Sequence, residues 1–429
     1  MMIRSHAVLL TAIAVSAVSQ SSIFAVLPPL ARDIGLSDVQ IGSIASIAAF
    51  CFVAFAPFLG SLSERRGRVP FVVIGLVAAI VTNLVFALTL WAGLAGGLAA
   101  ATVYGLLLGS RILLNVSWGG MFPAAFAYMA DAVPVARRST GAALLGAAFG
   151  LGSIVGPSVA WALTPLGTTA PFIGIAGLSL LSLMAVILYL REVKPAVPAA
   201  DLAASGSADQ PEADGFAKAF TRLWPSLLIG AAAAMAAIMV QQLTAFRLQD
   251  QYALAADAAT RLAGLALTAL AIATVAAQSF VIWRGEGWRP VSLLCLGAAA
   301  AAAGSAGFTL AGLAPAPWGT LALVLQCGPL ALLGMGIGLV LPSNAAAVML
   351  ATGGHSQGRA AGLLNAALGA GTMAGPLVAT ALYRLNALVP FAVATGLLCL
   401  ALAAAAWLRS RPPPSEMNLP AACLDPSAK

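Results

Sequence analysis

The chain has very little charge for its length: Asp, Glu, Lys and Arg make up only 8% of its 429 residues, while 61% of the residues are hydrophobic. A soluble domain carries about 25% charged residues, so this composition excludes a water-soluble globular protein. It predicts an all-α polytopic membrane protein, because a helix crosses a bilayer only when its residues are predominantly apolar.

Catalytic and nucleotide-binding motifs are also missing. The sequence holds no Gly-x-x-x-x-Gly-Lys phosphate loop and no His-Glu-x-x-His metal motif, and its two histidines and five cysteines show no metal-binding spacing. We therefore predict a protein that is not an enzyme and that uses no cofactor and no metal. The missing phosphate loop also argues against ATP hydrolysis on this chain.

Apolar runs long enough to cross about 30 Å of hydrocarbon occur twelve times. They span residues 7–30, 39–59, 70–92, 98–130, 140–163, 171–190, 224–246, 260–283, 290–313, 319–350, 360–383 and 389–408. No clear cleavage pattern follows the first run, so we interpret it as a retained helix. The predicted organisation is an amino-terminal six-helix bundle (1–192), a cytoplasmic linker (193–222), a carboxy-terminal six-helix bundle (223–410) and a disordered cytoplasmic tail (411–429).

Basic residues indicate the orientation of these helices. If both termini are cytoplasmic, the segments on that side hold 16 Lys and Arg residues, against Arg111 inside a span and four on the other side: Arg32, Arg247, Arg261 and Arg384. Cytoplasmic loops carry this excess, so we expect a bacterial-type inner (plasma) membrane protein with both termini inside. The net charge of +7 does not indicate nucleic-acid binding, because the bases lie in short loops without a recognition helix or basic-aromatic patch.

A repeat with an offset of 219 residues relates the two halves of the chain. It pairs Pro123 with Pro342, Pro157 with Pro376, and Arg65 with Arg284. Such a parallel repeat implies two related bundles in the same orientation, with a binding site at their interface near the membrane midplane.

A charged stretch, Gly60-Ser-Leu-Ser-Glu-Arg-Arg-Gly-Arg-Val-Pro70, separates the second and third apolar runs. Its glycines and its proline predict a tight cytoplasmic turn followed by a helix. The stretch resembles the loop between helices 2 and 3 of the major facilitator superfamily, Gly-x-Leu-x-Asp-Arg-x-Gly-Arg-[Arg/Lys], with glutamate in place of the aspartate and valine in place of the last base. The resemblance implies a gating loop whose members are Gly60, Glu64, Arg65, Gly67 and Arg68.

The run Ala148-Phe-Gly-Leu-Gly-Ser-Ile-Val-Gly-Pro157 resembles the helix 5 signature of twelve-helix drug-proton antiporters in this superfamily, including the tetracycline-resistance branch. Residues 27–37 and 171–192 resemble the same branch. Small residues four apart let helices approach closely, and proline permits a bend, so simple helix packing is the alternative reading of the motif. The motif residues in the two halves are Gly152, Gly156, Pro157, Gly371, Gly375 and Pro376.

Two charged residues of the fourth run match family positions. Arg111 occupies the helix 4 arginine position, although Asn115 replaces the following glycine, and the resemblance implies a role in substrate or proton coupling. Extension of Arg111 to the outer interface is the alternative, because about 30 Å of helix separates it from Asp131. The resemblance further implies that Arg65 or Arg68 pairs with Asp131 and that Glu64 approaches the amino end of helix 11 as a latch, with a solvated loop as the alternative.

None of the fourteen acidic residues falls in the middle of a span. Tetracycline exporters place acids within helices 1 and 3, where this chain has serines, Gln20, Thr82 and Asn83. A buried carboxylate is the usual proton carrier in such a site. Coupling therefore depends on Asp33 at the outer end of helix 1, on Asp131, with Arg111 as a participant, or it does not involve protons.

The predicted central cavity is lined by polar but mostly neutral side chains. Its candidate residues are Ser19, Gln20, Ser22, Arg111, Asn115, Trp118, Gln241, Gln242, Gln278, Gln326, Asn344 and Asn365. Ser22 and Gln241 are 219 residues apart, which predicts that they face each other across the central axis. Each of these residues has the alternative role of a hydrogen bond to a neighbouring helix, worth about 0.6 kcal/mol on average.

We predict a secondary transporter that works by alternating access of two six-helix bundles, exporting a small organic compound in exchange for protons. It would act as a monomer within the lipid bilayer. A lone positive charge favours neutral or anionic substrates, so uptake of an anionic metabolite or siderophore-like compound is the second hypothesis. The hypothesis from another class, a membrane sensor or scaffold that moves nothing, predicts a centre without a cavity.

Overall fold

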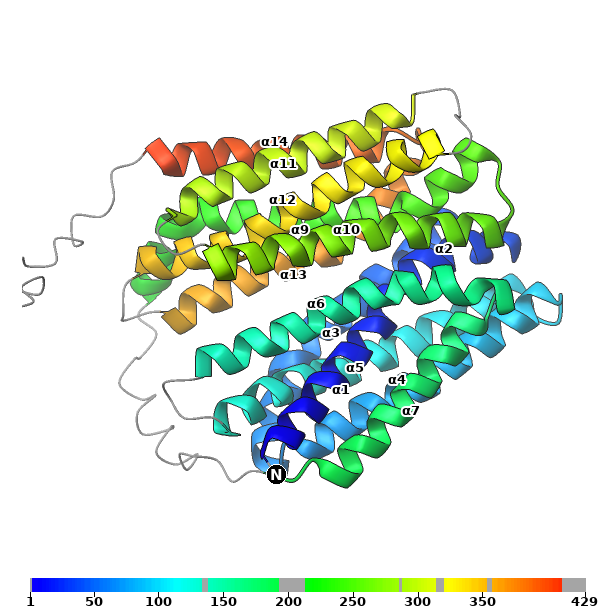
Figure 1. The fold of residues 1–429 in the computed structure, drawn as a ribbon, viewed down its shortest axis with the longest axis horizontal. Helices are drawn as coiled ribbons and strands as arrows, with labels where there is room; N and C mark the ends of the chain where they lie inside the picture. The colour runs from blue at the N-terminus through cyan, green and yellow to red at the C-terminus, as the bar shows by residue number, and fades with distance from the viewer. Residues whose placement is uncertain are drawn as a thin grey trace, which may run out of the picture.

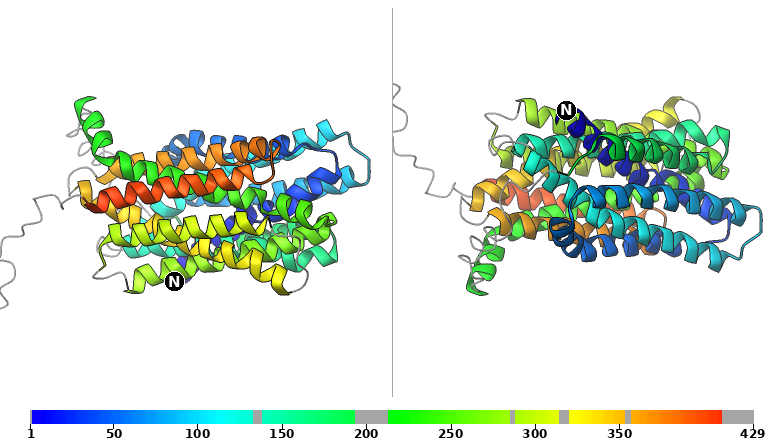
Figure 2. Two further views of the ribbon diagram at one scale, coloured as in Figure 1. Left: turned by 90° about the horizontal axis from the view of Figure 1, so that it is seen from above. Right: turned by 90° about the horizontal axis from the view of Figure 1, so that it is seen from below.

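The computed structural model describes residues 2–132, 138–192, 213–284, 288–313, 320–352 and 357–410, and the elements in these ranges are all helical. Twelve spans within them are long and apolar enough to cross a membrane. The predicted all-α, twelve-helix fold class is confirmed. Figure 2 shows the helices running roughly parallel to one another along the long axis of the molecule.

Each half of the chain forms one bundle of six spans (Figure 1). The amino-terminal half contains α1 (Met2–Ser21), α2 (Ile23–Asp33), α3 (Asp38–Arg66), α4 (Val69–Leu94), α5 (Ala100–Ala132), α6 (Arg138–Leu163), the short 3-10 helix η2 (Thr164–Leu166) and α7 (Ala170–Tyr189). The carboxy-terminal half contains α9 (Ala213–Tyr252), α10 (Ala256–Arg284), α11 (Pro290–Ala311), α12 (Thr320–Thr352), α13 (Gln357–Tyr383) and α14 (Val389–Ser410).

The two bundles have the same internal arrangement. In the first, α1 packs against α6 and α7, and α5 packs against α3 and α4; in the second, α9 packs against α13 and α14, and α12 packs against α10 and α11. From α3 onward, corresponding helices also begin 218 to 221 residues apart. For example, α3 begins at Asp38 and α10 at Ala256, and α7 begins at Ala170 and α14 at Val389. This agreement extends the sequence repeat to the whole fold.

Three boundaries differ from the expectation. Ser22 interrupts the first span, but its backbone stays helical (φ −61°, ψ −29°), so α1 and α2 together form one span. Helix α3 continues to Arg66, because no residue between Asp38 and Gly67 takes a positive φ angle that would end the helix. Helix α9 begins at Ala213, so residues 213–222 are helical although the sequence assigned them to the linker. The rest of that linker and the tail 411–429 lie outside the described residues.

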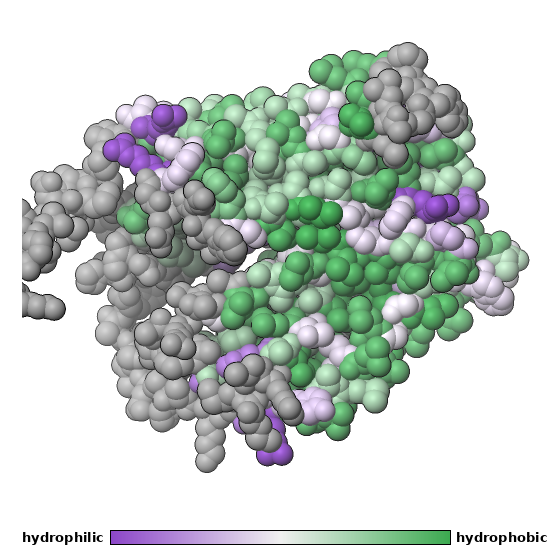
Figure 3. All heavy atoms as spheres, in the orientation of Figure 1, coloured by the Kyte–Doolittle hydropathy of each residue, from purple (hydrophilic) through white to green (hydrophobic). Residues whose placement is uncertain are grey.

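The outer surface of the bundles suits a lipid environment. Large apolar side chains are exposed on it, among them Phe58, Leu88, Trp91 and Leu181 at 63–65% exposure. Figure 3 shows a broad hydrophobic band across the visible face, with hydrophilic residues gathered toward the two ends of the molecule. An apolar surface of this extent is unfavourable in water, so its exposure is explained by contact with acyl chains.

The two halves lie close together at the end where α2 is found and diverge toward the end where the amino terminus lies (Figure 1). At the close end, α2 packs against α9 and α10 of the other half. Two further pairs join the halves, α3 with α13 and α6 with α10, and these pairs correspond to each other under the repeat. This arrangement leaves a space between the bundles, which holds the candidate site.

Candidate functional site

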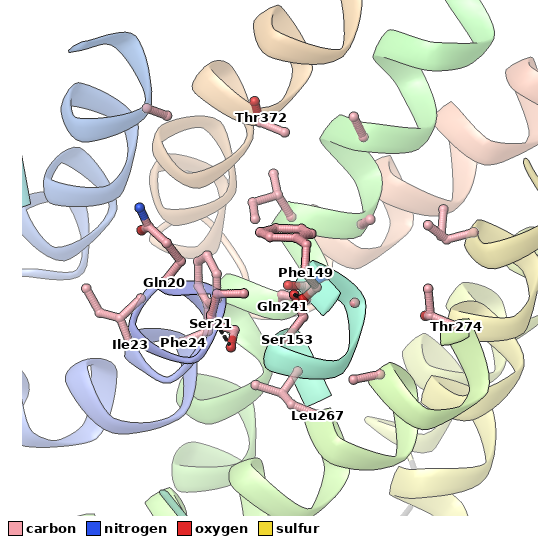
Figure 4. A pocket seen from close by; sticks show the side chains of 18 of the residues that line it. Gln20, Ser21, Ile23, Phe24, Phe149, Ser153, Gln241, Leu267, Thr274 and Thr372 are labelled. Carbon is pink, nitrogen blue, oxygen red and sulfur yellow. Dashed lines mark hydrogen bonds between the residues drawn. The ribbon is translucent and has the colours of Figure 1, made fainter. Parts of the chain in front are cut away.

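A cavity of about 590 Å³ lies between the two bundles. Its walls come from the first span, α3, α5 and α6 on one side and from α9, α10, α12 and α13 on the other. Figure 4 shows Gln20 and Ser21 of α1, Phe149 of α6 and Thr274 of α10 around this space. The presence of a cavity at the interface contradicts the hypothesis of a solid-packed sensor or scaffold.

Six of the twelve predicted cavity residues are on its wall. They are Gln20, Arg111, Asn115, Trp118, Gln241 and Gln278. They come from both halves of the chain, and their contact with a substrate stays a prediction.

The other predicted cavity residues lie elsewhere, so their expected position is corrected. Ser19, Ser22, Gln242, Gln326 and Asn344 are at most 3% exposed and are not among the lining residues. Where their hydrogen bonds are seen, these join neighbouring groups: Ser19 accepts from Asn83 at 2.7 Å, and Asn344 donates to the Ser226 carbonyl at 2.8 Å. Asn365 is exposed on α13 and does not line the cavity either.

Ser22 illustrates why these expectations were wrong. Its hydroxyl donates to the Ser19 carbonyl at 3.5 Å, and its side chain is fully buried, whereas Gln241, the residue at the same repeat position, lines the cavity. Ser21, one position earlier, lines the cavity instead. Adjacent helical residues point about 100° apart, so an error of one position in the predicted facing residue is enough to exchange Ser21 for Ser22.

Arg111 is held inside the protein at the cavity wall. It is 6% exposed, and it donates to the Ser19 carbonyl at 3.4 Å and to Gln20 Oε1 at 3.2 Å. Asn115 completes the group, because its amide donates to the Arg111 carbonyl at 3.0 Å and its Oδ1 accepts from Gln20 at 3.4 Å. The alternative in which Arg111 extends to the outer interface is therefore wrong.

The charge of Arg111 has no acidic partner on the cavity wall. Among the described residues that line the cavity, Arg111 is the single charged side chain, and its partners are a carbonyl and an amide. A buried charge is costly unless it is paired. The site therefore carries a positive charge available to a ligand.

Aromatic side chains cover one part of the cavity beside Arg111. Trp118 of α5 packs against Phe52 of α3 and Phe149 of α6, with ring centroids 5.1 and 5.7 Å apart, and all three residues line the cavity. Phe122 lies behind them, 5.0 Å from the Trp118 ring. The three helices thus supply aromatic rings to the same cavity wall that holds Arg111.

A second buried arginine was missed by the sequence interpretation, which placed Arg247 in an outer segment. Helix α9 extends to Tyr252, so Arg247 lies inside the second bundle at 2% exposure. Its guanidinium stacks 3.9 Å from the Phe308 ring centroid, donates to the Phe308 carbonyl, and donates to Gln326 Oε1 at 3.2 Å. This hydrogen bond holds the Gln326 side chain of α12 against α9, so the side chain does not reach the cavity wall.

At the amino-terminal end of the molecule, Arg68 pairs with Asp131 at 2.8 Å. This contact between the start of α4 and the end of α5 confirms the pairing that the family resemblance implied for Arg65 or Arg68. Both side chains are largely buried, at 12% and 13% exposure. The pair lies within one half, so it braces the first bundle rather than linking the two.

The turn between α3 and α4 is organised by Glu192, which the sequence did not single out. The Glu192 carboxylate accepts from the backbone N–H groups of Arg68 and Val69 at 2.7 and 3.0 Å, so it satisfies free donors at the start of α4. Gly67 has φ +95°, and a Cβ there would lie 3.0 Å from the Glu192 carboxylate. Glycine at 67 is therefore required by both the backbone and the packing.

The remaining gating-loop candidates are helical. Gly60, Glu64 and Arg65 lie in the last turns of α3, and Gly60 faces Pro123, which would be 3.4 Å from an added Cβ. The expectation that Gly60 supplies freedom for a turn is wrong, because the chain reverses only at Gly67. The contact of Glu64 with the start of helix 11 stays a prediction, since residues 353–356 lie outside the described part of the chain.

The motif glycines of helices 5 and 11 pack within their own halves. Added Cβ atoms would collide with backbone or side chains of α1 at Gly152 and Gly156, and with those of α9 at Gly371 and Gly375. Close helix packing, the alternative reading of the motif, is thus what the glycines provide.

The motif prolines instead face the opposite half. A Cβ on Gly264 of α10 would lie 2.7 Å from the Pro157 carbonyl oxygen, and a Cβ on Gly42 of α3 would lie 2.7 Å from the Pro376 carbonyl oxygen. The two contacts lie in helix pairs that correspond under the repeat, α10 with α6 and α3 with α13, and both sit where the bundles meet. They allow the bundles to approach backbone to backbone at two equivalent points.

The end of the molecule at α2 is closed by a charged cluster between the halves. Arg32 donates to Asp38 in its own half at 2.7 and 2.8 Å and to Asp250 of α9 at 2.7 Å. Asp250 also accepts from the Tyr383 hydroxyl at 2.6 Å, and the Arg32 guanidinium lies 4.3 Å from the Phe246 ring centroid. Asp33, the predicted coupling residue, is exposed beside this cluster at the end of α2.

These features define a class of protein: a polytopic membrane protein in which two related six-helix bundles surround a central cavity. The family model of the Major Facilitator Superfamily matches residues 9–349 and 329–426, so the chain belongs to this family of transporters.

Individual relatives agree with this assignment. The chain is 32% identical over 194 residues to the tetracycline resistance protein, class C, of Escherichia coli, and 26% identical over 185 residues to multidrug resistance protein 2 of Bacillus subtilis. These matches cover 43% of this chain in each case and 44% and 43% of the two relatives, so they span less than half of each protein. They confirm the predicted resemblance to the tetracycline-resistance branch.

Solved structures show the same fold over almost the whole chain. A bacterial homologue of the human lysosomal transporter Spinster, in an inward-facing and occupied conformation, matches with a TM-score of 0.67 at 13% identity and covers 96% of this chain and 98% of its own. The human organic anion transporter MFSD10 matches with a TM-score of 0.63 at 20% identity, covering 94% and 99%.

Proposed function

We propose that this transporter moves a small organic compound across the inner membrane by alternating access and that it works as a proton-coupled exporter. The observation that carries the proposal is the cavity between two repeat-related bundles whose contacts are concentrated at the α2 end. Rocking of the bundles about this interface would close the cavity at one end and open it at the other.

The interface is suited to such a motion. At the Gly264–Pro157 and Gly42–Pro376 approaches, a glycine of one half lies against a backbone carbonyl of the other, so small groups make the closest contacts between the bundles. The Arg32–Asp250 pair must break for the α2 end to open. With both termini in the cytoplasm, as the distribution of basic residues indicates, this end is the outer one and the described state is inward-facing.

Efflux is supported by the relatives, which are resistance proteins for tetracycline and for multiple drugs. The acids proposed to carry the proton are Asp33, which is exposed at the α2 end, and Asp131, which pairs with Arg68 at the amino-terminal end. Neither acid lines the cavity, so either would have to act on it through the movement of the bundles.

The test is flux in proteoliposomes that contain the purified protein. We expect an imposed pH gradient to drive movement of at least one compound in a panel of neutral, cationic and anionic organic molecules, and we expect a protonophore to abolish it. Flux that is driven equally well without the pH gradient would contradict proton coupling. Failure of all panel members to move under any gradient, including exchange against themselves, would contradict transport.

The second hypothesis, uptake of an anionic metabolite, is favoured by one observation. Arg111 has no acidic partner among the described lining residues, whereas a cavity designed for cations would present a carboxylate. Inward flux of an anion driven by a membrane potential or by a counter-substrate, with no response to pH, would establish this function in place of export.

A further inference from the structure

We propose that the cavity selects organic anions with a flat apolar body, binding the anionic group at Arg111 and the body against Trp118, Phe52 and Phe149. The inference rests on the proposed transport function, because it concerns the same cavity, but it is independent of direction and of the coupling ion.

The cavity wall presents a positive charge. Among the described residues on the cavity wall, Arg111 is the one charged group, and its hydrogen bonds to the Ser19 carbonyl and Gln20 are long, at 3.4 and 3.2 Å. Charge-assisted hydrogen bonds to a carboxylate are shorter, at about 2.7–2.9 Å, and roughly twice as strong as neutral ones. An anion would therefore be a better partner for Arg111 than the neutral groups that now surround it.

The cavity wall also holds hydrogen-bond donors that have no partner. Arg111 Nε and Trp118 Nε1 are both buried without a hydrogen-bond partner among the described residues. The two residues are seven positions apart on α5, so they lie on the same face about 10 Å apart along the helix. Buried donors are rarely left unpaired. A ligand that brings acceptors to this face would satisfy them, whereas a cationic ligand would bring further donors.

Another part of the cavity wall is aromatic. Phe52, Trp118 and Phe149 come from three helices and all line the cavity. The Trp118 ring centroid lies 5.1 Å from that of Phe52 and 5.7 Å from that of Phe149. Aromatic rings bury large apolar area and pack well against another flat ring. The opposite wall offers neutral groups such as Gln241, Thr274 and Gln278, which leave a second charge on the ligand without a partner. A volume near 590 Å³ lies in the range of about 300–1,000 Å³ that suits drug-sized ligands.

The experiment compares ligands that share a naphthalene ring and carry polar groups of different charge, with the wild-type protein in detergent. The probes are 2-naphthoate, the neutral 2-naphthamide and the cationic 2-naphthylmethylammonium, with acetate as an anion that lacks the ring, and the dissociation constants are measured by isothermal titration calorimetry. We expect 2-naphthoate to bind at least about tenfold more tightly than the amide, and the cation and acetate to bind more weakly than naphthoate. Equal or tighter binding of the cation, or no binding of naphthoate up to its solubility limit, would overturn the proposal.

Three variants assign the recognition to residues. Arg111→Gln should remove the preference for naphthoate over naphthamide, and Arg111→Lys should keep most of it because the charge remains. Trp118→Leu should weaken both probes by a similar factor and leave their ratio unchanged. Gel-filtration profiles check that each variant is folded. An unchanged ratio in folded Arg111→Gln would overturn the role of Arg111, and the wild-type ligand series still tests the anion preference if that variant does not fold.

Transport measurements keep this inference separate from the proposed function. If naphthoate binds but shows no self-exchange in proteoliposomes, the selectivity of the cavity stands and transport fails. If cations are carried in preference to naphthoate, transport stands and the proposed selectivity fails.

Discussion

Arg32 and Asp250 lie 218 residues apart in the chain and in different bundles, and their side chains form an ion pair of 2.7 Å at the closed end of the molecule. Asp38 and Tyr383 hold the two partners in place from either side. In the alternating-access cycle that we propose, the pair must separate when this end opens, so its strength would contribute to the balance between the two states.

Asp250→Asn is expected to shift this balance toward opening at the α2 end. Ion pairs with exposed members contribute about 0.2–1 kcal/mol, which corresponds to a population change of up to about fivefold. Spin-label distances between the outer ends of α2 and α9, measured by pulsed electron resonance, should show more of the wider separation. Asp257→Asn removes an exposed acid from the first turn of α10 and is the matched control. Equal shifts in both variants would contradict a specific role for Asp250.

Gly67→Ala is expected to lower stability by more than Gly96→Ala. Both glycines have positive φ angles, +95° and +73°, which cost about 1–2 kcal/mol for an L residue. At Gly96 an added Cβ meets nothing within 4 Å, whereas at Gly67 it meets the Glu192 carboxylate. Thermal unfolding in detergent measures both variants, and the extra loss at Gly67 reports the contact with Glu192 together with its extended backbone at φ +95° and ψ +156°. If Gly67→Ala were no less stable than Gly96→Ala, Glu192 would not organise this turn.

Gly42→Ala and Gly264→Ala are expected to impair transport without preventing insertion. Each added Cβ would press on a proline carbonyl of the other half, and overpacking of this kind costs about 1–3 kcal/mol. That strain falls on the contact between the bundles, so exchange rates in proteoliposomes should fall severalfold for each variant. Gly109→Ala, where the added atom meets nothing within 4 Å, is the control and should retain normal exchange. Full activity of the first two variants would show that the bundles do not need this close approach.

Arg247→Met is expected to reduce stability while leaving ligand affinity in the cavity unchanged. Arg247 connects α9 to the Phe308 carbonyl and to Gln326, and it does not line the cavity. Loss of these buried hydrogen bonds should cost about 1–3 kcal/mol, which thermal unfolding would detect. An altered affinity for 2-naphthoate in a folded Arg247→Met protein would indicate that the second buried arginine communicates with the site.

The fold was predictable from the sequence because its signal is local. A run of about 20 apolar residues can only be a membrane span in a chain of this composition, and the repeat offset predicted which helices correspond. The Arg68–Asp131 pair was also predictable, because the residues that carry the family resemblance implied it.

The site was only partly predictable, for two physical reasons. Spans that are apolar on every side give no periodicity to show which face is turned inward, so Ser21 and Ser22 could not be distinguished. Pairing across the fold has no local signature either: the Arg32–Asp250 contact depends on how the halves meet. Arg247 was placed outside because the apolar run ends near it, but the helix continues and buries it among aromatic rings.

The most direct test of alternating access is the reactivity of a cysteine introduced into the cavity by Gln241→Cys, in a chain whose five native cysteines are replaced. A membrane-impermeant maleimide is applied to right-side-out and to inside-out vesicles. The account predicts labelling from both sides, with the ratio of the two rates changed by a bound substrate. Labelling from one side only, under every condition of substrate and pH gradient, would contradict it.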